Sequence, residues 1–253
     1  MNTRFALGLA AGLLALGIND PSPAAAATPA PVIVELFTSE GCSSCPPADA
    51  VLSTLIKQPI AGVEVIALGE HVDYWNHGGW ADPFSSSKFS GRQSDYSRTF
   101  GKDTVYTPQM IVDGKTQFVG SDADRARQAI LAAARAPKAE VLLTKTGPNR
   151  LLVRVDHLPG SVQNDPADVL LAVTEDGLVS SVGGGENSGR HLVHNAVVRS
   201  LQVLGTTSGG VFTATPSVKP TAGWERGHLH AVIFVQEHGS RRIVGAAEVA
   251  LGV

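Results

Sequence analysis

The feature that most constrains the fold is a Cys42-Ser-Ser-Cys45 segment between an apolar run and a helical pattern. Residues 31–38 are almost continuously apolar and β-branched, which is typical of a strand buried on both faces. Apolar side chains then recur at helical spacing to about residue 57, and the two prolines after Cys45 suit a first helical turn. The pattern predicts Cys42 at the entrance of a helix and Cys45 about one turn inside it.

The cysteine count indicates that this pair serves chemistry rather than stability. Cys42 and Cys45 are the only 2 cysteines among 253 residues. A bridge between them closes a loop of about four residues and adds roughly 2 kcal/mol at best, against about 4.7 kcal/mol for a hundred-residue loop. Disulfide-dependent secreted domains carry many more cysteines. The spacing therefore favours a redox-active pair.

The N-terminal residues predict export. Arg4 gives a positive start, residues 5–18 are apolar, and small residues lead to a cleavage pattern near Ala26 or Ala27. The apolar run is shorter than the roughly 20 residues that a membrane span needs. We expect residues 1–27 to be a signal peptide that is removed, leaving a periplasmic or secreted chain without a membrane span.

The composition and net charge exclude a disordered chain and argue against a nucleic-acid-binding protein. The chain is 43% hydrophobic and 17% charged, which excludes a disordered polyelectrolyte. Its formal net charge of −3 argues against a nucleic-acid partner, which would require a basic surface.

The order of predicted elements suggests a thioredoxin layout followed by β structure. Strand, helix, strand, helical insertion, hairpin and helix are expected at residues 31–38, 42–57, 62–68, 85–100, 105–119 and 121–135. Short β-rich runs separated by turn residues then continue to the C-terminus. We expect an α/β thioredoxin-like domain with a helical insertion at 28–136 and an all-β sandwich-like domain at 137–253.

Five motifs resemble those of a secreted thioredoxin-like family that is catalogued as a domain of unknown function, DUF1223. They are Glu35-Leu-Phe-Thr-Ser-Glu-Gly-Cys-Ser-Ser-Cys-Pro-Pro-Ala-Asp49, His71-Val-Asp-Tyr-Trp75, Trp80-Ala-Asp-Pro-Phe84, Val105-Tyr-Thr-Pro-Gln-Met110 and Gly185-Glu-Asn-Ser-Gly-Arg190. The resemblance implies a thioredoxin-like fold with a redox-type cysteine pair, and it implies no established activity. Ser43 and Ser44 replace the Gly-Pro of thioredoxin itself.

The residues assign distinct roles around the pair. The helix N-terminus should lower the pKa of Cys42, so that its thiolate attacks, while Cys45 resolves the mixed disulfide. In the thioredoxin layout Pro108, preceded by Thr107, should be cis and face the pair, where its backbone can bind an extended peptide. Glu35 is a candidate proton acceptor, and its alternative is a carboxylate paired with Lys or Arg.

These features favour an exported thiol–disulfide oxidoreductase that acts on cysteine-containing proteins or peptides and needs no cofactor. One alternative is an exported copper or zinc carrier with Cys42, Cys45 and His71 as ligands. Another is a non-catalytic binding or structural module with a passive disulfide. His191 and His194 are expected to be structural, since residues three apart on a strand face opposite sides. Glu186 and Arg190 are expected to pair across a glycine-rich turn.

Overall fold

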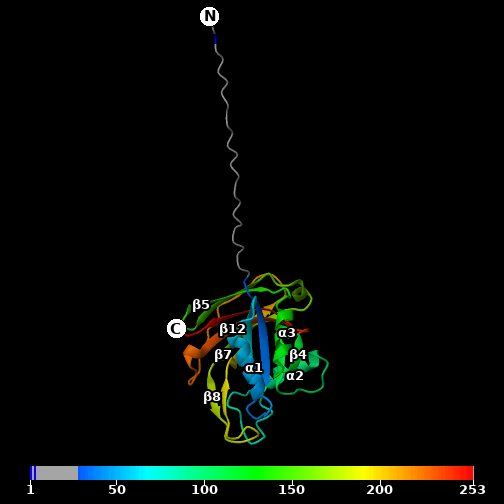
Figure 1. Cartoon of the computed structure of the whole chain (residues 1–253), viewed down its shortest axis with the longest axis vertical. Helices are drawn as coiled ribbons and strands as arrows, with labels where there is room; N and C mark the ends of the chain where they lie inside the picture. The colour runs from blue at the N-terminus through cyan, green and yellow to red at the C-terminus, as the bar shows by residue number, and fades with distance from the viewer. Residues whose placement is uncertain (2, 4–27, 253) are drawn as a thin grey trace.

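The computed structural model describes residues 1, 3 and 28–252 of the chain (Figure 1). The predicted signal peptide, residues 1–27, lies outside the described residues except at positions 1 and 3. Within the described part, no helix combines the length and the apolar character that a bilayer crossing requires.

The described fold begins with the predicted strand–helix–strand unit. β1 (Ala30–Thr38), α1 (Pro46–Lys57) and β2 (Val63–His71) follow one another, and β1 pairs with β2 in parallel along its whole length. The apolar, β-branched residues of β1 are buried because the sheet is covered on both faces. The predicted parallel unit is therefore confirmed.

A helix, a hairpin and a further helix come next. α2 (Ser87–Thr99) begins after Ser86, whose hydroxyl oxygen accepts a hydrogen bond from the Lys88 amide. β3 (Gln109–Val112) and β4 (Thr116–Val119) form the predicted hairpin, with positive φ angles at Asp113 and Gly114 in its turn. α3 (Ala123–Ala133) follows, and β3 lies antiparallel to β1.

Nine strands and two short 3-10 turns make up the rest of the described chain. The strands are β5 (Glu140–Gly147), β6 (Arg150–Asp156), β7 (Ala167–Glu175), β8 (Leu178–Ser181), β9 (His191–His194), β10 (Val197–Thr207), β11 (Phe212–Ala214), β12 (Leu229–Glu237) and β13 (Ile243–Ala250). The 3-10 turns are Gly160–Gln163 and Arg226–His228.

The strands from both sides of residue 137 join one sheet. Its eight strands have the order β13-β12-β7-β10-β2-β1-β3-β4, and β10 runs parallel to β2 at Val197 and Gly69. A three-stranded sheet, β11-β6-β5, and a two-stranded sheet, β8-β9, are separate. The chain is thus mixed α/β with additional antiparallel sheets. The domain division at residue 137 remains a prediction, and the large sheet crosses that position.

The β-rich part packs differently from the self-contained sandwich that the strand pattern suggested. Leu151 and Val153 of β6 pack against Leu171 of β7 and Ile233 of β12, so two sheets do face one another. The other face of β12 is not solvated, because Phe234 packs in the same cluster as α2. This packing has a physical cause: β7 and β12 have apolar residues on both faces, and a shared sheet covered on both sides buries them.

The helices of the first half lie on opposite faces of the large sheet. α1 and α3 cover the face that carries Val34 and Leu36, whereas α2 covers the face of Ile33 and Phe37 (Figure 1). The loop between β1 and α1, which carries both cysteines, is therefore placed at the end of a buried strand, on the α1 side.

Candidate functional site

The cysteine pair is a disulfide at the start of α1. Cys42 and Cys45 are bridged, with their Cα atoms 5.4 Å apart. Cys45 is the N-cap residue of α1, and the first two helical positions are prolines. The helix therefore begins one turn later than expected, because residues 42–45 form a tight turn in which the Cys45 amide donates to the Cys42 carbonyl at 3.1 Å. The prediction that the pair lies at a helix N-terminus is confirmed.

The sulfur atoms are covered although the residues between them are not. Cys42 is 1% exposed and Cys45 is 0% exposed, while Ser43 and Ser44 are exposed. The Oγ atom of Ser44 lies 3.3 Å from the Sγ atom of Cys42. Because a disulfide sulfur carries no proton, the Ser44 hydroxyl is the donor in this contact. A donor in that position would also stabilise a thiolate on Cys42.

The Thr107–Pro108 peptide bond is cis, as predicted. The Pro108 carbonyl accepts a hydrogen bond from the Gly120 amide at 3.0 Å. Gly120 has space for no side chain, since a Cβ atom there would lie 2.7 Å from Leu36, 3.1 Å from Ala48 and 3.4 Å from Pro108. These contacts place the cis peptide beside the first turn of α1.

Trp75 connects the cis-proline loop with the cysteine loop. Its indole Nε1 donates to the Thr107 hydroxyl at 2.8 Å. Its Cβ atom would lie 2.9 Å from a Cβ atom at Gly41, so only glycine fits directly before Cys42. Gly41 and Thr107, which are 66 residues apart in two different sequence motifs, therefore meet at one side chain, Trp75, which belongs to a third motif.

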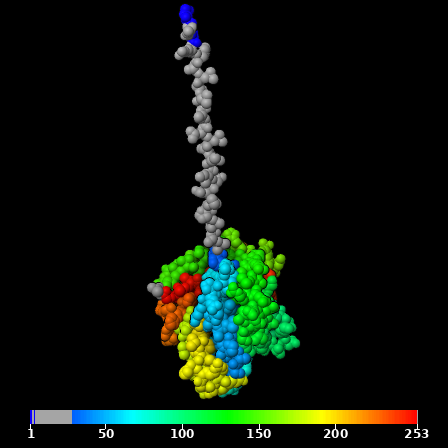
Figure 2. All heavy atoms as spheres, viewed as in Figure 1, coloured from blue at the N-terminus to red at the C-terminus, as the bar shows by residue number. Residues whose placement is uncertain are grey.

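The loop between β8 and β9 lies on the cysteine loop. The side-chain amide of Asn187, which is 1% exposed, donates to the carbonyl oxygens of Glu40 at 2.8 Å and Cys42 at 2.9 Å. The Glu186 carboxylate accepts a hydrogen bond from the Ser43 amide at 2.9 Å, and this bond lowers the pKa of Glu186. Figure 2 shows the yellow surface of the β8–β9 region beside the blue surface of the cysteine loop and α1.

The expected pairing of Glu186 with Arg190 is wrong. Arg190 instead donates through Nη1 to the Oδ1 atom of Asn187 at 2.9 Å, so it orients the amide that holds the cysteine loop. Glu186 instead accepts from the Ser43 amide, which lies in the turn before α1.

A buried histidine–carboxylate pair lies next to the cysteine loop. His71 Nδ1 is 2.7 Å from Asp82 Oδ2, and both side chains are buried. Burial opposes charge on both groups, but their mutual hydrogen bond and attraction prevail, so the pKa of His71 is raised and the pKa of Asp82 is lowered. Asp82 also accepts from the Glu40 amide at 2.9 Å and thereby fixes the end of the cysteine loop.

A second buried histidine, His194 of β9, stacks edge-to-face on His71 with ring centroids 4.8 Å apart. Its Nε2 atom is 3.1 Å from Glu40 Oε1, whose partner oxygen accepts from Trp80 at 2.7 Å. Burial would raise the pKa of Glu40, but hydrogen bonds from His194 and Trp80 outweigh it and lower that pKa. The expected alternation on this strand is confirmed, with His191 exposed and His194 buried.

A small cavity lies between this cluster and α1. It measures about 10 Å³, at the lower limit for one water molecule, and Thr38, Asp49, His71 and His194 line it. His194 Nδ1 is 3.8 Å from Asp49 Oδ2 and has no hydrogen-bond partner among the described residues. Burial raises the pKa of Asp49 despite the attraction of His194. Asp49, Glu40 and Asp82 occur in the quoted motifs, but no spacing rule joins them.

Glu35 does not lie beside the cysteines. Its carboxylate contacts Arg92 at 2.6 Å and accepts from the Tyr96 hydroxyl at 2.5 Å, on the sheet face that α2 covers. The structure thus supports the ion-pair alternative over the proton acceptor. The cause is the two-residue period of β1, which directs Glu35 with Ile33 and Phe37 away from α1.

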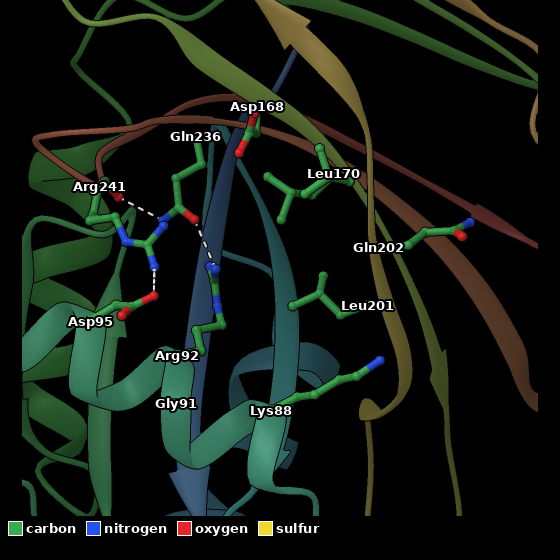
Figure 3. Close-up of a pocket in the computed structure, with 11 residues that line it drawn as sticks. Lys88, Gly91, Arg92, Asp95, Asp168, Leu170, Leu201, Gln202, Gln236 and Arg241 are labelled. Carbon is green, nitrogen blue, oxygen red and sulfur yellow. Dashed lines mark hydrogen bonds and ion pairs between the residues drawn. The ribbon is translucent and has the colours of Figure 1, made fainter.

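A cavity of about 410 Å³ opens beside α2, away from the cysteine loop (Figure 3). Arg92 lies at its inner side and donates to Gln236, and Arg241 pairs with Asp95 at its edge. Its lining comes from α2, β7, β10, β12 and the turn after β12.

The predicted metal ligands are engaged in other contacts. Cys42 and Cys45 are bonded to each other, and His71 Nδ1 is held by Asp82. Within the described ranges, no group of three or more His, Cys, Asp and Glu side chains is arranged to hold a metal ion. The copper or zinc alternative stays a prediction.

Fold and site define an α/β protein with a disulfide of C-x-x-C spacing between a buried parallel strand and its following helix. The family model described as "Protein of unknown function (DUF1223)" matches residues 33–236, and the chain belongs to this family.

Two solved structures share the architecture. A crystal structure of a protein from Agrobacterium tumefaciens has 27% sequence identity and a TM-score of 0.73, with coverage of 90% of this chain and 97% of that one. HBP35 of Porphyromonas gingivalis has 16% identity and a TM-score of 0.61, with coverage of 89% and 76%, and indicates the fold alone. A comparison with curated proteins found no match.

Proposed function

We propose that this protein is an exported thioredoxin-like thiol–disulfide oxidoreductase that exchanges electrons with cysteines of other proteins or peptides. The observation that carries the proposal is the Cys42–Cys45 disulfide at the N-terminus of α1, with the cis Thr107–Pro108 peptide beside the first turn of that helix. A stabilising role alone does not explain so short a loop, because its closure adds only about 2 kcal/mol.

The proposed reaction proceeds in two exchange steps. A partner thiolate attacks Cys42 Sγ, the Cys42–Cys45 bond breaks, and Cys45 leaves with the electron pair and then takes up a proton. The second partner thiol, once deprotonated, attacks the partner's sulfur in the mixed disulfide and releases Cys42 as a thiolate. The partner is oxidised to a disulfide and the pair is reduced to a dithiol, and the reverse sequence reduces a partner disulfide.

Two features of the site support Cys42 as the sulfur that forms the mixed disulfide. The helix N-terminus supplies partial positive charge, and the Ser44 hydroxyl is within 3.3 Å of Cys42 Sγ. Both stabilise a Cys42 thiolate, which makes Cys42 the better leaving group in the second step. Cys45, as the N-cap residue at 0% exposure, is placed to close the bridge again.

The test uses a dithiol peptide and three variants. Cys42→Ser should abolish oxidation of the dithiol peptide. When Cys45→Ser is mixed with the disulfide form of the same peptide, the Cys42 thiolate should attack one peptide sulfur, release the other as a thiol, and accumulate a mixed disulfide that mass spectrometry detects. Ser44→Ala should retain activity at a reduced rate. Full activity in Cys42→Ser, or a wild-type disulfide that exchanges with no thiol, would overturn the proposal and favour a passive bridge.

A further inference from the structure

The burial of the disulfide sets a condition on any reaction at Cys42. An attacking thiolate must reach the sulfur atom directly, since exchange proceeds through a mixed disulfide. Cys42 is 1% exposed and Cys45 is 0% exposed, so the sulfur atoms are closed to a protein partner in this conformation. Access requires that a neighbouring segment moves.

Residues 183–190, here called the cover segment, are a neighbour of the cysteine loop that lies outside the large sheet. They connect β8 and β9, which form a two-stranded sheet of their own outside the eight-stranded sheet. The segment is also internally bonded: the Ser188 amide donates to the Gly185 carbonyl, and the Arg190 amide donates to the Asn187 carbonyl. A displacement therefore breaks contacts to the cysteine loop while it leaves the large sheet and the shape of the segment intact.

The side-chain contacts that join the cover segment to the cysteine loop are hydrogen bonds, and a further contact joins it to the loop after β2. Asn187 donates to Glu40 and Cys42, and Glu186 accepts from Ser43. Gly184 lies directly on Gly79, where a Cβ atom would come within 2.3 Å of the Gly79 carbonyl oxygen. Hydrogen bonds of this kind exchange with water at a modest net cost of about 1 kcal/mol each. They can hold the cover segment closed without locking it.

The Glu186 contact depends on the state of the cysteine pair. Its carboxylate occupies the Ser43 amide, which directly follows Cys42 and would otherwise help to stabilise a thiolate there. While Cys42 is in a disulfide, the carboxylate meets no competing charge. Once Cys42 becomes a thiolate, two negative groups compete for the same region, and the closed position loses stability.

We propose that the cover segment closes over the oxidised pair and is released on reduction, with Glu186 as the positioning residue that couples the two. That opening of the cover segment admits a thiol partner to Cys42 rests on the proposed function. Because such coupling is reciprocal, the closed cover segment in turn favours the disulfide over the reduced pair.

The first experiment compares hydrogen exchange in the oxidised and the reduced full-length mature protein. Amides of residues 183–190 and the Ser43 amide should exchange faster after reduction, while β5 and β6 serve as the internal reference. Equal exchange of residues 183–190 in both states would overturn the proposal. This readout needs no substrate, so it is independent of whether the protein catalyses thiol exchange.

The second experiment measures the redox equilibrium with glutathione for wild type and Glu186→Gln. Loss of the carboxylate charge should shift the equilibrium toward the reduced pair by roughly threefold to tenfold, given an exposed charged hydrogen bond. A tenfold change corresponds to about 30 mV. Alkylation of the reduced protein across pH should show a lower pKa for the Cys42 thiol in this variant, which a purely structural role of Glu186 would not produce.

Glu140→Gln is the matched control, because Glu140 is an exposed carboxylate on β5 that pairs with His157. It should leave the equilibrium and the alkylation profile unchanged. An unchanged equilibrium in Glu186→Gln would overturn the coupling. If the cover segment opens on reduction but no dithiol peptide is oxidised, the proposed function fails and the redox-linked cover stands.

Discussion

Asn187 donates a hydrogen bond of 2.9 Å to the main-chain oxygen of Cys42, although 145 residues separate the two in sequence. The same amide also reaches the Glu40 carbonyl, so one side chain from the β8–β9 loop holds both sides of Gly41. The cysteine loop is thus shaped by residues outside the strand–helix–strand unit that carries it. This relationship makes the second half of the chain part of the site.

Asn187→Ala should loosen the cysteine loop. It leaves the Glu40 and Cys42 carbonyls without their side-chain donor, and unsatisfied buried groups cost about 1–3 kcal/mol. We expect a fall of that size in the free energy of unfolding and faster reduction of the disulfide by dithiothreitol. Asn164→Ala, an exposed asparagine after a 3-10 turn, is the control and should change neither quantity. Unaltered reduction kinetics in Asn187→Ala would contradict the expectation.

Gly184→Ala tests the close approach of the two loops. An added Cβ atom would lie 2.3 Å from the Gly79 carbonyl oxygen, and a backbone atom cannot turn aside as a side chain can. Overpacking of this kind costs about 1–3 kcal/mol. Gly91→Ala is the counterpart, because Gly91 lies inside α2 with no neighbour within 4 Å of an added Cβ atom, and alanine there should stabilise by about 0.5–1 kcal/mol. Thermal unfolding of both variants should shift in opposite directions.

The features that the sequence predicted correctly are local. The strand before Cys42, the parallel pairing with β2 and the turn at Asp113 and Gly114 follow from short patterns whose physical requirements are met within a few residues. The helix start was displaced because Cys45 itself serves as the cap. Helix ends depend on cap geometry, which residue type alone determines poorly.

The features that were missed depend on distant contacts. Glu35 does not lie beside the cysteines because the two-residue period of β1 turns its side chain to the opposite face of the sheet. Its partner there, Arg92, belongs to α2, and no local pattern links the two residues. The strand pattern predicted that His191 and His194 face opposite sides, but the partners of His194, Glu40 and His71, come from another part of the chain. The glycine-rich residues 183–190 indicated a tight loop. No periodicity shows which surface such a loop covers.

The Arg92 network on the α2 face should matter for stability alone. Replacing Arg92 with Met leaves the Glu35 charge buried without its partner, which costs about 3–5 kcal/mol. Glu70→Gln is the sharp comparison. Burial raises the pKa of Glu70 well above its usual range. The attraction of Arg92 opposes this rise, and the charge of Glu35 adds to it. Glutamine is uncharged and therefore resembles the protonated form of Glu70. We expect a large loss of unfolding free energy in the first variant and a small change in the second.

Redox measurements give the control for this pair of variants. Because Glu35 and Arg92 lie across the sheet from α1, folded Glu70→Gln should keep the wild-type equilibrium with glutathione. A shifted equilibrium would mean that the network reaches the cysteine loop through the sheet.

His230 predicts a pH dependence of stability. Hydrogen bonds to Asp176 and Glu248 raise its pKa to about 10, above the ordinary value of 6.5. A raised histidine pKa contributes stability that is fully present below about pH 6.5 and is lost as the pH rises toward 10. Since the site is partly solvated, we expect wild type to exceed His230→Gln by about 1–2 kcal/mol at pH 6, with convergence at pH 10. Urea unfolding at pH 6, 8 and 10 measures this difference, and a gap that widens with pH would contradict it.

Asp49 also predicts a pH dependence of stability, but here the charged form at neutral pH is the one that destabilises the fold. Burial raises the pKa of its carboxyl group above the ordinary value of 3.8, so ionisation in the folded protein costs stability. The favourable contribution is fully present below the unfolded pKa and is lost as the pH rises through the folded pKa. Asp49→Asn keeps an oxygen that can accept from the Thr38 hydroxyl, now 2.9 Å away, and carries no charge to desolvate. We expect the free energy of unfolding of this variant to equal that of wild type near pH 3 and to exceed it at pH 7.

Asp103→Asn is the control, because Asp103 is exposed, and its free energy of unfolding by urea should stay equal to that of wild type at both pH values. A less stable Asp49→Asn at pH 7 would instead mean that attraction between the carboxylate and His194 outweighs burial.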